Sequence, residues 1–175
     1  MKTLKILLVL VAVILSGFSR DSQTGKTETG VTKTVKFKGV IITNPSAGLT
    51  VCTPAGPGIP TIAHSRTGTL QGYQTHGGKL ITELSTWEIS SCNTNFTTML
   101  NTAQIEGVVT VANGDSYSYT CTMTVNLVTN AVILNITVTG GVGIYEGATG
   151  EIMMTGIHSE SGIPVSGEGL INFPK

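Results

Sequence analysis

Charged side chains are scarce in this sequence, and their scarcity excludes several classes of protein. Only 11% of the 175 residues are Asp, Glu, Lys or Arg, and ten basic side chains balance ten acidic ones. A soluble domain usually has about 25% charged residues. A nucleic-acid-binding protein needs a dense basic surface, so we expect no nucleic-acid partner. The same balance argues against a disordered acidic tail and against a basic membrane-surface protein.

Patterns for long helices, metal sites and common catalytic motifs are also missing. No stretch repeats apolar residues with the spacing of an amphipathic helix. His64, His76 and His158 lack metal-ligand spacing and no Cys-x-x-Cys pair occurs, so we expect no metal and no cofactor. We expect ordinary surface or turn histidines, with His76 making a hydrogen bond that fixes a turn. No Gly-x-Ser-x-Gly nucleophile elbow is present.

Residues 1–19 have the plan of a secretory signal peptide. Two lysines precede an apolar run over residues 6–15, and the small residues Gly17 and Ser19 suit cleavage after Ser19. Crossing the ~30 Å of a bilayer core takes about 20 residues, so we expect no transmembrane span in the mature chain. Residues 20–30 are polar and rich in threonine and glycine, which predicts a flexible lead-in.

The end of this signal also bears on localisation. Residues 15–18 read Leu-Ser-Gly-Phe and resemble a bacterial lipobox, with Phe18 where the lipidated cysteine belongs. Lipidation requires the thiol, so Phe18 argues against a lipid anchor. We expect a released protein, periplasmic or extracellular, with an uncleaved N-terminal anchor as the alternative.

Residues 31–175 predict one all-β domain. The chain has 22 glycines and 28 threonines, a composition typical of strands and tight turns. Residues 44–62 contain four prolines and predict a long loop, because proline removes a hydrogen-bond donor from a sheet. About eight strands are expected, at residues 31–43, 66–73, 79–90, 104–112, 116–126, 131–139, 151–157 and 165–173.

The clearest strand pattern covers residues 116–126. Every second residue there is apolar or aromatic, and threonine, serine or asparagine stands between them. Asn113-Gly114 just before it is a strong hairpin signal. We expect one face of this strand inside the domain, carrying Tyr117, Tyr119, Cys121, Met123 and Val125. Eight short antiparallel strands form either a closed barrel or a sandwich, and periodicity leaves both open.

The three cysteines predict one disulfide after export. Cys121 lies in the apolar period of its strand, so it should point inward as a small apolar side chain. Cys52 and Cys92 lie in loop-like surroundings. Of the three possible pairings, we favour Cys52–Cys92, which would tie the proline-rich loop to the end of the strand that contains Trp87.

A glycine-rich segment links two predicted strands. Residues 139–156 read TGGVGIYEGATGEIMMTG. Taken alone, such a cluster predicts a turn and bulge. It also resembles the motif of the allene oxide cyclase barrel-like superfamily, which includes plant dirigent proteins and small secreted bacterial proteins. Residues 72–87, with Gly77 in place of the family's leucine, and residues 109–117 resemble two further family motifs. The positions that match the glycine-rich motif are Gly140, Gly141, Gly143, Tyr145, Gly147 and Gly150.

The resemblance implies an eight-stranded antiparallel barrel with a small apolar interior. The matching glycines and Tyr145 would shape the backbone, and no catalytic residue is carried over. We therefore expect a secreted, non-enzymatic protein that holds a small apolar molecule. Alternatives are an isomerase or cyclase of the family's plant type, and a cell-surface structural or interaction module that uses threonine-rich outer faces. The residues expected to line the interior are Trp87, Tyr117, Tyr119, Met123 and Val125.

Overall fold

The computed structural model describes residues 33–46, 48–54, 57–159 and 162–174. The expected signal peptide (1–19) and lead-in (20–30) lie outside the described residues. The described chain is all-β, with an antiparallel sheet whose eight main strands close into a ring. These strands are β1 (Lys33–Pro45), β4 (Thr67–Gln74), β6 (Thr86–Asn95), β7 (Leu100–Thr110), β8 (Ser116–Asn126), β9 (Ala131–Val142), β10 (Thr149–Ile157) and β11 (Ile163–Phe173).

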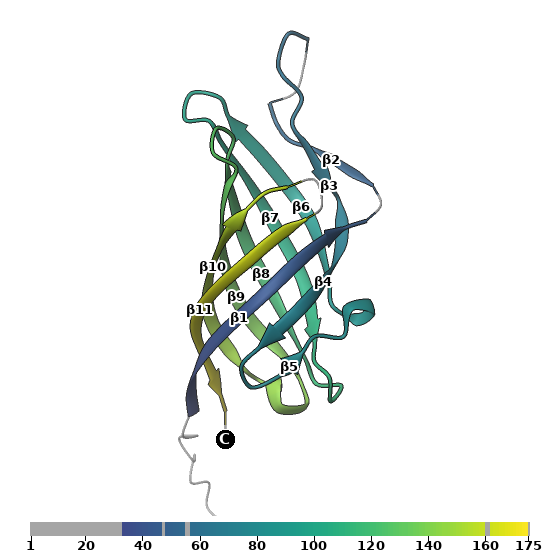
Figure 1. Cartoon of the computed structure of the whole chain (residues 1–175), viewed down its shortest axis with the longest axis vertical. Coiled ribbons are helices and arrows are strands. Elements are labelled where there is room, and N and C mark those ends of the chain that lie inside the picture. Colours follow the sequence, from purple (N-terminus) through teal and green to yellow (C-terminus); the bar gives the residue numbers. More distant parts are fainter. Residues whose placement is uncertain (1–32, 47, 55–56, 160–161, 175) are drawn as a thin grey trace, which may run out of the picture.

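Neighbours in the ring are mostly neighbours in the chain. The order is β1-β11-β10-β9-β8-β7-β6-β4, and pairing of β1 with β4 closes it. Figure 1 shows the strands wrapping around one long axis, with β1 crossing in front beside β4. Because every main strand has two neighbours, none of these eight leaves a whole edge unpaired. The expected eight-stranded antiparallel barrel is confirmed, and the sandwich is excluded.

Short elements close the two ends of the ring. The strands β2 (Leu49–Val51) and β3 (Ala63–Ser65) form a separate hairpin at one end, while β5 (Gly78–Lys79) lies at the other (Figure 1). Two short 3-10 turns complete the set, η1 (Thr82–Leu84) and η2 (Gly143–Tyr145). Within the described residues, no helix has the length and apolar character needed to cross a membrane.

The expected strand at residues 116–126 has the predicted bounds and faces. All five expected inward side chains are buried, from Tyr117 to Val125 along every second position of β8. Strand β8 pairs with β7 along its whole length, and with β9 on both sides of a register shift between Ser118 and Tyr119. The free Cys121 is buried among them, as expected.

Two sequence predictions fail beside β4 and β6. Residues 79–90 do not form one strand, because the chain leaves the sheet after Lys79, turns through η1 and re-enters only at β6. Leu80, before the η1 turn, is buried, whereas Leu84 at the end of the turn is exposed. The segment 44–62 is not all loop either, since its proline-free stretch Leu49–Val51 pairs with β3.

Candidate functional site

The ring encloses a cavity of about 290 Å³. Its middle is surrounded by one apolar residue from each of five successive strands, β6 to β10. Their cross-strand pairing places these side chains side by side in a belt. We call this set the isoleucine belt: Ile89, Ile105, Cys121, Ile136 and Ile152.

A buried polar chain closes the barrel at the β5 end. The hydroxyl of Tyr117 donates to Oε1 of Gln74 at 2.7 Å, and Nε2 of Gln74 donates to the Tyr145 hydroxyl at 3.1 Å. The two tyrosine rings also pack, with centroids 5.0 Å apart. Burial raises the pKa of both phenols, so they stay neutral hydrogen-bonding groups at physiological pH. Both hydroxyls therefore form hydrogen bonds with Gln74, and the three side chains close this end of the barrel. We call these three side chains the plug.

Two histidines lie at the opposite end of the cavity. His64 comes from β3 and His158 follows β10; both line the cavity, and their ring centroids are 6.1 Å apart. Nε2 of His64 lies 2.6 Å from Oδ1 of the buried Asn101, whose Nδ2 donates to Oγ1 of Thr94 at 2.8 Å. Burial, and then the charge of His64, lower the pKa of His158, so its imidazole is neutral at pH 7.

A disulfide holds the β2–β3 hairpin over this end. Cys52 and Cys92 are bonded, which confirms the expected pairing. Backbone hydrogen bonds on both sides of Thr53, to Cys92 and from Thr94, dock the chain against β6. A bulge after Ile89 shifts the alternation of β6, so that Cys92 also faces inward. The hairpin therefore stays where Leu49, Ala63, His64 and Ser65 line the cavity.

The structure places four of the five expected lining residues at the cavity. Trp87, Tyr117, Tyr119 and Met123 line it, whereas Val125 is buried but is not among the lining residues. The expected glycine-rich motif forms the η2 turn and its flanks, with Gly143 and Gly147 at positive φ and Tyr145 buried. Gly140, Gly141 and Gly150 belong to the ends of the adjoining strands β9 and β10.

The histidine pair is the part of the site that the sequence analysis missed. His64 and His158 were expected to be ordinary surface or turn residues. Each stands beside a predicted strand, His64 before residues 66–73 and His158 after residues 151–157, but only the closed ring shows that these ends meet.

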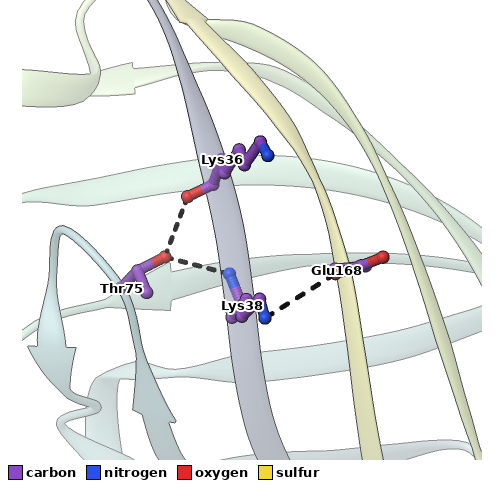
Figure 2. Close-up of polar contacts among 4 residues, drawn as sticks. All are labelled: Lys36, Lys38, Thr75 and Glu168. Atoms are coloured by element: carbon purple, nitrogen blue, oxygen red, sulfur yellow. Dashed lines mark hydrogen bonds and ion pairs between the residues drawn. The ribbon is translucent and has the colours of Figure 1, made fainter.

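His76, the histidine singled out in the sequence, lies outside the cavity. It occupies an exposed turn with φ of 64° and donates from Nε2 to the Lys36 carbonyl at 3.2 Å. Its neighbour Thr75 accepts from the Lys38 amide at 2.9 Å and donates to the same Lys36 carbonyl at 3.3 Å (Figure 2). Lys38 also pairs with Glu168 at 4.0 Å. The expected turn-fixing hydrogen bond of His76 is present, and it ties the turn to β1.

The cavity therefore offers an apolar body, two imidazoles at one end and a closed polar plug at the other. Across the described residues, no group of three or more His, Cys, Asp or Glu side chains could hold a metal ion. A scan against protein-family models finds none that matches this chain, and a search of curated proteins finds no matching sequence.

Proposed function

We propose that this protein is a small exported barrel that binds one small apolar molecule in its cavity without catalysing a reaction. The observation that carries the proposal is the apolar cavity of about 290 Å³ inside the ring. An engineered apolar cavity of about 150 Å³ stays dry and binds benzene, so this one has room for roughly 12 non-hydrogen atoms. Small eight-stranded barrels have interiors that can hold one such ligand.

Export is part of the same proposal. Residues 1–19 resemble a secretory signal, and the Cys52–Cys92 disulfide is compatible with an oxidising compartment. We place the mature protein in the periplasm or outside the cell. The resemblance of residues 139–156 to the allene oxide cyclase barrel-like superfamily supports a ligand-holding barrel, because cavities of that kind hold small apolar molecules.

Binding is favoured over catalysis by the state of the groups in the cavity. Burial raises the pKa of the Cys121 thiol to about 12, so it is neither a nucleophile nor a base near pH 7. The hydroxyls of Tyr117 and Tyr145 are engaged with Gln74. One observation favours an isomerase as the second candidate, namely the His64–His158 pair, since imidazoles are the commonest general acids and bases.

The proposal can be tested with the fluorescence of Trp87, which is the single tryptophan of the chain and lines the cavity. We expect 1-decanol, which has no absorbance of its own in this range, to change the Trp87 emission saturably. The Ile136→Phe variant fills the isoleucine belt and should abolish this response. Its matched control is Ile133→Phe on the same strand β9, because Ile133 faces outward and is 44% exposed.

Three results would count against the proposal. One is a wild-type protein whose emission does not respond to 1-decanol. The second is equal binding by Ile136→Phe and wild type. The third, turnover of an epoxide or other reactive substrate in the cavity, would favour the isomerase instead.

A further inference from the structure

None of the described residues that line the cavity is Asp, Glu, Lys or Arg. At the β5 end, the polar chain through Gln74 is already satisfied. At the hairpin end, His64 and His158 offer ring nitrogens. A ligand that fills the cavity therefore meets two imidazoles at the hairpin end, and no Asp, Glu, Lys or Arg side chain among the described lining residues.

The orientation of His64 is fixed by its buried partners. Nδ2 of Asn101 donates to Thr94, so Oδ1 of Asn101 must accept from Nε2 of His64. Asn101 and Thr94 are both buried, which keeps water from competing for these bonds. An imidazole in its uncharged form has one N–H, and His64 directs Nε2 to Asn101, which leaves Nδ1 as the nitrogen that can accept a hydrogen bond.

His158 supplies the complementary group. Its backbone amide donates to the Asn130 carbonyl, which anchors the residue just beyond β10. Its ring lies edge-on to His64, with centroids 6.1 Å apart and planes at 63°. A neutral His158 ring has one N–H donor and one acceptor nitrogen. The pair can thus accept one hydrogen bond and donate another to the same small group.

We infer that the ligand carries a single neutral hydroxyl, of an aliphatic alcohol or a phenol, which binds between His64 and His158 while its apolar body lies against the isoleucine belt. This inference rests on the proposed function and specifies its ligand class. A hydroxyl both donates and accepts, as the two imidazoles require. An ionised carboxylate would be buried with no Lys or Arg among the described lining residues to pair with it, which is strongly unfavourable.

Three ligands with a ten-carbon chain separate these possibilities at pH 8, with Trp87 emission as the readout. They are 1-decanol, decanoate, which is ionised at this pH, and 1-methoxydecane, which accepts but cannot donate. We expect 1-decanol to bind at least about tenfold more tightly than decanoate. We expect it to bind several-fold more tightly than the ether, because only the alcohol can donate to Nδ1 of His64. This ranking needs no variant, so it does not depend on any substitution being tolerated.

A variant then tests the position of the hydroxyl. His158→Leu removes one imidazole, whose ring packs against that of His64, and should weaken 1-decanol binding about tenfold. His76→Asn is the matched control, because His76 lies outside the cavity and asparagine tolerates its positive φ. Unchanged affinity in His158→Leu would overturn the placement of the hydroxyl.

The outcomes also distinguish the two levels of the proposal. Decanoate binding as tightly as 1-decanol, or the ether matching the alcohol, would overturn this inference and leave the binding function in place. If none of the three ligands changes the Trp87 emission, the proposed binding function fails, and this inference fails with it.

Discussion

The indole of Trp87 lies over Gly68, its partner across the β4–β6 pair, and occupies the space that a side chain at Gly68 would need. Trp87 pairs on its other side with Gly107, and the ring of Tyr119 lies over Gly107 in the same way. Two glycines and two aromatic residues therefore alternate across four strands. Alternation of small and large residues of this kind lets a narrow barrel hold large rings.

This arrangement predicts that Gly68→Ala destabilises the barrel. The added methyl would collide with the indole of Trp87 and with the backbone carbonyl of Asn44. Overpacking of this kind costs about 1–3 kcal/mol, and we expect a loss of that size in urea unfolding together with a shift in Trp87 emission. Gln71→Ala on the same strand changes an exposed side chain and should alter stability by less than about 0.5 kcal/mol. Equal stability of Gly68→Ala and wild type would contradict the packing described here.

Removing one hydroxyl from the plug should also be costly. In Tyr117→Phe, Oε1 of the buried Gln74 loses its donor, which costs about 1–3 kcal/mol. Tyr73→Phe makes the same chemical change at a residue that is 63% exposed, and should have little effect. Urea unfolding of both variants measures the difference. If the two variants lose the same stability, the plug does not contribute as proposed.

The disulfide should stabilise both the fold and the position of the β2–β3 hairpin at its end of the cavity. Cys52 and Cys92 are 40 positions apart, and closing a loop of that length contributes about 4 kcal/mol in the chain-entropy model. The Cys52→Ala, Cys92→Ala double variant should lose stability of this order. It should also bind 1-decanol more weakly, because the hairpin that carries His64 is released. Adding a reductant should lower the stability and the 1-decanol affinity of the wild type and leave both quantities unchanged in the double variant. Equal effects on the two proteins would argue against this role of the disulfide.

Strand β8 could be predicted from the sequence because its period of two is uninterrupted and it lies between two paired neighbours. The region before β6 could not be predicted, because the η1 turn changes which side chains face inward. Residues 79–85 contain no glycine or proline that would have indicated a turn. The inward direction of Cys92 depends on the bulge after Ile89, which composition does not reveal. Its pairing with Cys52 was still predictable, by assigning Cys121 to a strand interior.

The histidine pair depends on the whole ring. His64 reaches the cavity only because the hairpin is docked on β6, and His158 only because β10 ends on the same side. Both conditions involve contacts between segments distant in the chain. Local spacing, on which sequence analysis relies, therefore contains no signal for the pair. The part of the cavity lining that β8 contributes, in contrast, follows directly from the alternation of that strand and includes Tyr117, Tyr119 and Met123.

The lowered pKa of His158 predicts a loss of stability in acid. A histidine whose pKa is lower in the folded than in the unfolded protein makes its full contribution to stability at pH values above the unfolded pKa of 6.5. That contribution is lost as the pH falls through the folded pKa, because the unfolded chain takes up the proton more readily. We expect the melting temperature to fall between pH 6.5 and pH 4, and to fall less in His158→Gln. Parallel pH profiles for the two proteins would contradict this assignment.

At alkaline pH the buried side chains of Cys121 and Tyr119 should also make stability depend on pH, with stability lost as the pH rises. Burial raises the pKa of Cys121 from 9.0 to about 12, and it raises the pKa of Tyr119 in the same direction. An acid with a raised pKa contributes stability that is complete below the unfolded value. This contribution is lost as the pH rises through the folded value, because the unfolded chain releases the proton first. The free energy of unfolding should therefore decline between about pH 9 and pH 12.

Alkylation of Cys121 tests the same burial independently. The folded protein at pH 8 holds this thiol protonated and out of solvent, so iodoacetamide should label it far more slowly than it labels the urea-unfolded chain. The disulfide occupies the other two cysteines, so the intact protein reports on Cys121 alone. Bound 1-decanol should slow labelling further, because Cys121 belongs to the isoleucine belt that the ligand would cover. Labelling of the folded protein at the rate of the unfolded one would mean that the cavity is open to water, and an apolar ligand would then gain little by entering it.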